Sequence, residues 1–213
     1  YPWMLENAYY SKDINVRKDF GYPDNYKLIG DSGGFQIQSF GKKGKKISIE
    51  PIRILRWLES NVDIGMNLDI PPWTNFNASL KQSVTNFDLF ERERQNYSMK
   101  LYNILHGRTL SDATQWYEQA QRFDFDGWAI GIKPSRDHLM QLTGYLLLRD
   151  ADAPNLDNLH YFGMSDTKNA LMLSMVAQKF GHDITYDISS WVMGDRYRHF
   201  YYPYSTRFKY MFG

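Results

Sequence analysis

The chain has 213 residues, 43% of them hydrophobic, which is enough for one domain with a substantial buried core. Its 25 Lys and Arg residues balance 24 Asp and Glu residues, so the net charge of the protein would not attract a polyanionic partner. A local patch of basic residues would have to bind such a partner. The cysteine count is 0, which excludes disulfides and any thiolate-built zinc site within the chain.

Short apolar runs that end in a small or polar residue recur along the chain, and each predicts a buried strand that leads into a loop. In chain order they span residues 26–34, 62–72, 101–107, 127–135, 159–166 and 183–191.

Amphipathic segments lie between these runs. Residues 48–60 have apolar side chains near helical spacing, and residues 165–181 have Ser165 placed for an N-cap and Gly181 placed for a C-terminal stop. Strands that alternate with helices predict an α/β protein made of parallel βα units, either an open doubly wound sheet or a (β/α)₈ barrel. No repeat, low-complexity tract or linker divides the chain, so we expect one domain over residues 1–213.

In either architecture, the chemistry belongs at the carboxyl ends of the strands. Polar and small residues fall at those positions: Asp31, Ser32, Asp69, His106, Gly131, Ser165 and Asp187. A lone aspartate at a strand end is often only a helix N-cap, but together these residues indicate one functional face.

The string Gly-Asp-Ser-Gly-Gly at residues 30–34 also surrounds the nucleophilic serine of trypsin-like proteases. Such a protease is an all-β double barrel that needs a histidine and an aspartate on earlier strands. Residues 1–31 contain no histidine, and the chain alternates strands with helices. We therefore do not expect Ser32 to be a nucleophile.

The string GDSGGFQ at residues 30–36, followed by IQSF, resembles the signature of the tRNA-guanine transglycosylase (queuine tRNA-ribosyltransferase) superfamily. Members of this family exchange guanine for a 7-deazaguanine base in nucleic acid. The resemblance continues in order from Glu6 to Trp191, through ENAYY at 6–10, ISIEPIRILRWLESNVDIGMNLDIPP at 47–72, LYNILHG at 101–107, FDGWAIGI at 125–132, HYFGM at 160–164 and DITYDISSW at 183–191. It implies a (β/α)₈ TIM-type barrel whose ends are altered relative to the family.

The resemblance also implies which carboxyl groups do the chemistry. Base exchange with retention of configuration needs a carboxylate nucleophile that holds the sugar covalently, and Asp187 matches that position. Asp31 matches the general acid/base that protonates the departing guanine and later accepts a proton from the incoming base.

Base recognition is implied in the same way. Asp69 matches the residue that accepts hydrogen bonds from guanine N1–H and the exocyclic amine, and Phe35 matches the aromatic ring that stacks on the base. The remaining expected base-binding residues are Ser32 in a supporting role, His106 as a donor to O6, Gly131, and Phe162 or Met164 as the opposite wall. A histidine at a strand end is equally often structural, so two roles stay open for His106.

The chain departs from the family in its pocket and in its missing zinc motif. Pro71 and His106 stand where cysteine and glutamine are usual, and Ile132 follows Gly131 where a second glycine is usual. We favour a compact member of the phage and bacterial branch that inserts 7-deazaguanines such as preQ0 into DNA, over a chain that lacks its ends. tRNA stays open as the substrate, and so does a non-catalytic nucleic-acid-binding role.

This interpretation needs no cofactor and no metal. No run approaches the roughly 20 apolar residues of a membrane span, and a signal peptide is not recognisable, so we expect no membrane contact and a cytoplasmic protein, in the host cytoplasm if a phage encodes it. An oligomer or a helper protein is compatible with the sequence.

Two basic segments are candidates for phosphate contact. Lys42, Lys43, Lys45 and Lys46 lie in a glycine-flanked loop, and Arg196 and Arg198 lie in the aromatic C-terminal segment. A charge run is more often a solvated loop, and the aromatic segment equally fits a hairpin that closes the barrel, so both alternatives stay open.

Overall fold

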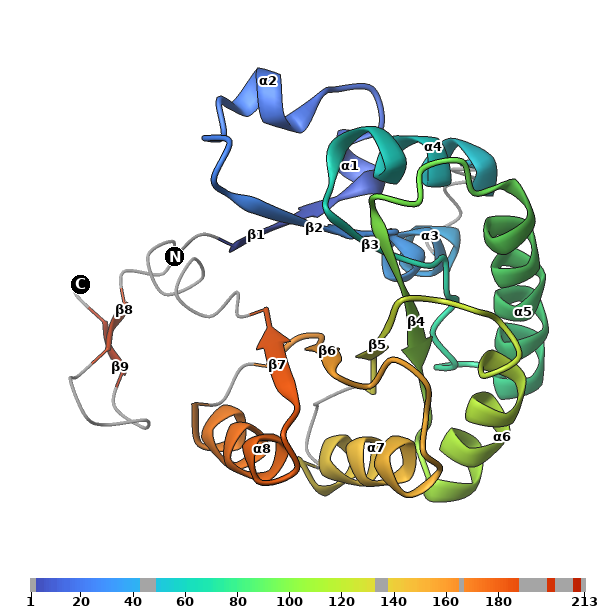
Figure 1. Cartoon of the computed structure of the whole chain (residues 1–213), viewed down its shortest axis with the longest axis vertical. Coiled ribbons are helices and arrows are strands. Elements are labelled where there is room, and N and C mark those ends of the chain that lie inside the picture. The colour runs from blue at the N-terminus through green and yellow to red at the C-terminus, as the bar shows by residue number, and fades with distance from the viewer. Residues whose placement is uncertain are drawn as a thin grey trace.

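A computed structural model of the chain describes residues 3–42, 49–132, 138–164, 167–187, 199–201 and 209–211. The protein is an α/β fold built around a curled seven-stranded parallel sheet that forms part of a barrel (Figure 1). The α/β class predicted from the alternating pattern is therefore confirmed.

The strands of this sheet follow one another in space in the order of the sequence. They are β1 (Trp3–Asn7), β2 (Lys27–Asp31), β3 (Ile64–Met66), β4 (Lys100–Leu105), β5 (Gly127–Ile130), β6 (Asn158–Tyr161) and β7 (Asp183–Tyr186). A doubly wound sheet reverses its strand order at a switch point, and this sheet does not, so that alternative is wrong. Within the described residues, β1 and β7 are not paired with each other.

Six of these strands lie in the six apolar runs, and β1 was not expected from the sequence. Most of the helices that connect the strands lie on the outer side of the curl (Figure 1). They are α1 (Ala8–Ser11), α2 (Val16–Phe20), α3 (Gly34–Lys42), α4 (Pro51–Asn61), α5 (Phe76–Glu93), α6 (Leu110–Ala120), α7 (His138–Asp150) and α8 (Thr167–Lys179). Gly181 has a φ of 80° and closes the end of α8, as predicted, whereas Ser165 lies outside the described residues.

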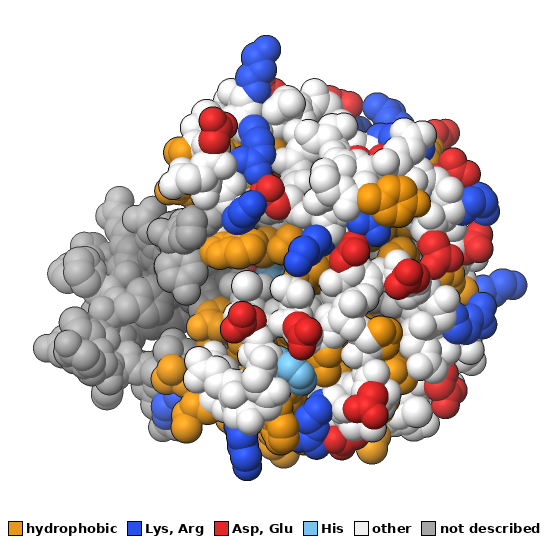
Figure 2. Space-filling view, viewed as in Figure 1, with side chains coloured by type: hydrophobic (Ala, Val, Ile, Leu, Met, Phe, Trp, Pro, Cys, Tyr) orange, Lys and Arg blue, Asp and Glu red, His pale blue; other side chains and the backbone are white. Residues whose placement is uncertain are grey.

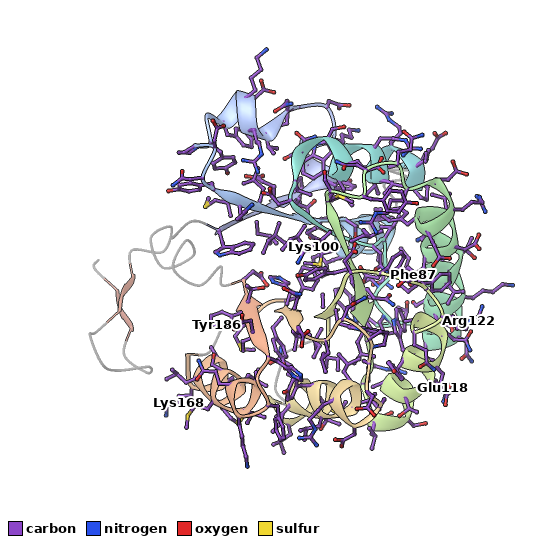
Figure 3. All side chains as sticks on the ribbon, in the orientation of Figure 1. Phe87, Lys100, Glu118, Arg122, Lys168 and Tyr186 are labelled. Atoms are coloured by element: carbon purple, nitrogen blue, oxygen red, sulfur yellow. The ribbon has the colours of Figure 1, made fainter. Side chains whose placement is uncertain are left out.

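The core has two parts because side chains alternate between the two faces of each strand. The inner face of the curl holds Ile29, Ile64, Met66, Tyr102, Ile104 and Ala129. The outer face packs against the amphipathic helices. Phe87 lies between α5 and the sheet, while Glu118 and Arg122 point away from it (Figure 3). The sheet is thereby held rigid from both sides, and its strand ends are fixed relative to one another.

The outer surface has Lys and Arg side chains interspersed with Asp and Glu, as the near-zero net charge predicts (Figure 2). Among the described residues, no helix combines the length and the apolar character that crossing a membrane requires. Strands β8 (His199–Tyr201) and β9 (Lys209–Met211) form a separate antiparallel pair. This pairing fits a hairpin in the C-terminal segment, but in the described part of the chain it does not join the seven-stranded sheet.

Candidate active site

Two large cavities lie at opposite ends of the sheet. One, of about 530 Å³, lies at the amino ends of the strands beside Lys27, Lys100 and Asp183. The other, of about 480 Å³, lies at the carboxyl ends and is lined by Asp31, Phe35, Gln36, Asp69, Pro71, Trp73, Ile104, His106, Gly131, Phe162, Gly163 and Asp187. The second cavity, called the carboxyl cleft below, is the candidate site, because α/β folds place their chemistry at this end and three carboxyl groups converge there.

Asp31 ends strand β2 and is held from two sides. Asn7 caps α1 by accepting a hydrogen bond from the Tyr9 N–H at its Oδ1, and this turns the Asn7 Nδ2–H₂ group toward Asp31 Oδ2, to which it donates. The Gly33 N–H donates to Asp31 Oδ1 at 3.1 Å. Burial, helped by the nearby Asp69 and Asp187 carboxylates, nevertheless raises the pKa of Asp31 from 3.8 to about 7, against the lowering effect of these two hydrogen bonds. Asp31 can therefore give or take a proton near neutral pH.

Asp187 follows β7 on the other side of the carboxyl cleft. Its backbone N–H donates to the Tyr161 carbonyl at 3.3 Å, and its Oδ1 accepts a hydrogen bond from the Gly163 N–H at 2.5 Å. Burial raises the pKa of the Asp187 carboxyl above its usual value, and the Gly163 N–H opposes that rise. A carboxylate oriented by a backbone donor at the rim of a cleft is suited to attack as a nucleophile.

Asp69 and His106 are in direct contact, which the sequence alone did not predict. His106 Nε2 lies 2.5 Å from Asp69 Oδ2, and both side chains are buried. The His106 ring packs edge-on against Trp116 and lies over the backbone of Gly131, where an added Cβ would come within 2.4 Å of the ring. Gly131 is therefore required by the histidine beside it.

Gly34 has a similar role at the start of α3. A Cβ on Gly34 would lie 1.8 Å from the carbonyl oxygen of Asp69, so only glycine allows α3 to approach this strand end. The third glycine of the GDSGGFQ string thus allows α3 to pack against Asp69.

Aromatic side chains form the walls of the carboxyl cleft. Phe35 is 50% exposed, and its ring meets that of Trp73 edge-on at a centroid distance of 4.7 Å. Phe162 is half-buried and also lines the cleft. These rings leave a slot with apolar sides and a floor of carboxyl groups, which suits a flat polar ring.

The structure brings most of the expected site residues together, but it places two of them beneath the cleft. Ser32 is fully buried, and its hydroxyl donates to the Asn67 carbonyl at 2.9 Å. Met164 is 1% exposed and packs in the core against the helices. Neither residue lines the cleft, so Ser32 supports the loop from below, and Phe162 provides the wall for which Met164 was the alternative.

Four lining residues were not singled out from the sequence: Gln36, Trp73, Ile104 and Gly163. Gln36 lies within the GDSGGFQ string, and Trp73 follows two prolines after a strand end, so the sequence position of each could have indicated a site residue. Nothing in the sequence around Ile104 or Gly163 indicated that these residues line the cleft.

The basic residues expected at phosphates are only partly placed. Lys42 ends α3 and only its backbone is described, whereas Lys43, Lys45, Lys46, Arg196 and Arg198 lie outside the described residues. Among the described residues that line the carboxyl cleft, none is Lys or Arg. Across the described ranges, no group of three or more His, Asp or Glu side chains is arranged to hold a metal ion. Comparisons with protein-family models and with curated proteins find no match to this sequence.

Proposed function

We propose that the chain is a guanine transglycosylase, which exchanges guanine in a nucleic acid for a 7-deazaguanine base through a covalent aspartyl-sugar intermediate. The observation that carries the proposal is the pair of carboxyl groups with different environments in one cleft. Asp31 is set to titrate near neutral pH, and Asp187 is oriented by a backbone N–H. Two carboxyl groups with separated roles are what displacement at an anomeric carbon with retention requires.

In the first half of the proposed reaction, an oxygen of ionised Asp187 attacks C1′ of the sugar. The C1′–N9 bond breaks, its electron pair goes to the base, and protonated Asp31 gives its proton to the departing guanine. The products are an aspartyl-sugar ester, neutral guanine and ionised Asp31.

In the second half, Asp31 accepts the N9 proton of the incoming base. N9 then attacks C1′, the ester bond breaks, and its electron pair returns to Asp187 as a carboxylate. Both carboxyl groups end in their starting states, so no cofactor is consumed. A half-buried acid whose pKa is about 7 is suited to both directions of proton transfer.

Recognition of the base follows from the same cleft. His106 occupies only Oδ2 of Asp69, which leaves Oδ1 for the N1–H and exocyclic amine edge of guanine. Phe35 and Trp73 on one side and Phe162 on the other would stack on the base, and stacking of this kind contributes about 1–3 kcal/mol per base. The base must leave its own stack to reach the cleft.

We further propose that the curled sheet belongs to a (β/α)₈ barrel, and that DNA is preferred over tRNA. Support for the barrel is the sequential order of seven parallel strands. Support for DNA is the altered pocket, in which Pro71 and His106 stand where the tRNA enzymes that the chain resembles usually have cysteine and glutamine.

Radiolabelled guanine tests this proposal. The protein is incubated with the label and, separately, with duplex DNA, single-stranded DNA and tRNA, and label retained in each polymer is measured. We expect label in DNA and none with Asp187→Ala, while Asp183→Asn, an exposed aspartate on the same strand, keeps activity. Label in tRNA alone would change the substrate and keep the mechanism. Exchange by Asp187→Ala, or no label in any polymer, would contradict the proposal.

A further inference from the structure

We propose that His160 is a positioning residue for Asp187, which keeps that carboxylate ionised and oriented by presenting an Nε2–H group to it. The proposal rests on the role of Asp187 as the nucleophile. His160 lies on β6, beneath the floor of the carboxyl cleft, and its Nε2 is 3.9 Å from Asp187 Oδ1. Among the described residues, this buried nitrogen has no hydrogen-bond partner.

His160 is a neutral imidazole at physiological pH. Its side chain is 2% exposed, and burial lowers its pKa from 6.5 to about 3. The ring of Phe162, which lines the cleft above, meets it edge-on at a centroid distance of 4.8 Å. A neutral imidazole carries one N–H, so its effect on Asp187 depends on which nitrogen holds the hydrogen.

Thr185 on β7 and Asp187 contact the two nitrogens of the His160 ring, and together they set its tautomer. The Thr185 Oγ1 lies 3.0 Å from His160 Nδ1 and 3.4 Å from the Leu159 carbonyl oxygen. The hydroxyl hydrogen can go to either acceptor, but the Asp187 carboxylate, 3.9 Å from Nε2, favours the tautomer whose hydrogen lies on Nε2. In that tautomer the Thr185 hydroxyl donates to Nδ1, over the shorter of its two contacts. The opposite tautomer would turn a lone pair toward the carboxylate, which is repulsive.

The need for such a donor follows from the charges in the cleft. Burial raises the pKa of Asp187, and Asp31 and Asp69 are further carboxyl groups of the same cleft. The strand partners of His160 on β5 and β7 are Ala129 and Thr185, which carry no charge, so Asp187 is the charged group that its Nε2 faces. A small rotation of the Asp187 carboxylate closes the 3.9 Å gap, and a hydrogen bond to the charged form lowers its pKa.

Carbon-13 NMR of the aspartate carboxyl groups tests this inference without relying on activity. The Asp187 signal is assigned by its loss in Asp187→Asn and titrated in the wild type and in His160→Phe and His160→Gln. We expect His160→Phe to raise the pKa of Asp187 by about one unit, and His160→Gln, which keeps an N–H donor, to restore most of the wild-type value. Thr185→Val removes the hydroxyl that contacts His160 Nδ1, so both tautomers of the imidazole can form. The pKa of Asp187 in this variant should lie between the wild-type value and that in His160→Phe.

Single-turnover formation of the aspartyl-sugar adduct gives the second readout. In His160→Phe the acidic limb of the pH profile should move upward by the same amount, which lowers the rate by up to about tenfold at the acidic end of that limb, with guanine affinity retained. His182→Gln, whose histidine contacts Tyr145 away from the cleft, is the control. An unchanged Asp187 titration in folded His160→Phe, or a shift that His160→Gln reproduces in full, would overturn the inference. A shift in a protein that forms no adduct would refute the proposed function instead.

Discussion

Replacing Asp31 with asparagine removes a carboxyl group whose pKa the structure raises to near neutral. Burial and the neighbouring carboxylates raise its pKa from 3.8 to about 7, so about half of the molecules carry its proton at pH 7. An ordinary aspartate is protonated in roughly one molecule in 1,000 at that pH. The fold therefore increases the protonated population of Asp31 about 500-fold. Asp31→Asn removes this acid and keeps an oxygen for the Gly33 N–H, but its NH₂ group then faces the Asn7 Nδ2–H₂ donor.

The same shift predicts how stability depends on pH. The folded pKa of Asp31 lies above the unfolded value, so its stabilising contribution is complete below about pH 4 and is lost as the pH rises through 7. A shift of about three units corresponds to at most roughly 4 kcal/mol, and the partial exposure of Asp31 reduces this. The loss of the Asn7 hydrogen bond acts at every pH, so linkage predicts the change with pH. We expect the free energy of unfolding of Asp31→Asn, relative to that of the wild type, to be about 1–3 kcal/mol higher at pH 8 than at pH 4.

Activity should change in the opposite direction. Loss of a general acid costs about 10²–10⁴-fold, so single-turnover release of guanine from an oligonucleotide should fall by that factor in Asp31→Asn. Urea unfolding at pH 4 and pH 8 measures the stability, and Asp24→Asn, at an exposed aspartate, is the control for both assays. Wild-type release of guanine, or a stability difference between the two proteins that is the same at pH 4 and pH 8, would refute the reasoning.

Three further substitutions test the close approach of α3 and the aromatic walls of the cleft. Gly34→Ala puts a methyl group 1.8 Å from the Asp69 carbonyl oxygen, so it should lower the free energy of unfolding in urea by about 3 kcal/mol or more. The control is Gly21→Ala, whose methyl group meets open space at a φ of 67° and should lower the free energy of unfolding by about 1 kcal/mol. Equal losses would show that the close approach is unimportant. Phe35→Ala and Trp73→Ala should each weaken nucleic-acid binding by about 5–150-fold in a fluorescence titration, the loss of one stacking contact, and unchanged affinity of both variants would exclude a stacking role.

The local pattern of apolar and polar residues in the sequence determined where the strands form and which polar residues follow them. Each apolar run that ends in a polar or small residue formed a strand, because buried parallel strands need continuous apolar sequence. Parallel connections bring all carboxyl ends to one edge, so Asp31, Asp69, His106 and Asp187 could be assigned to one site from the sequence. Strand β1 escaped prediction because it is a half-exposed edge strand with a mixed pattern.

The tertiary structure decided what these residues do to one another. Ser32 and Phe35 are three positions apart, yet the turn into α3 buries one and leaves the other 50% exposed at the cleft. The contact between Asp69 and His106, the place of Trp73 at the rim and the position of His160 near Asp187 are set by the packing of separate strands and loops. Distances between strands and burial set the pKa of Asp31, and neither is encoded in any single segment of the chain.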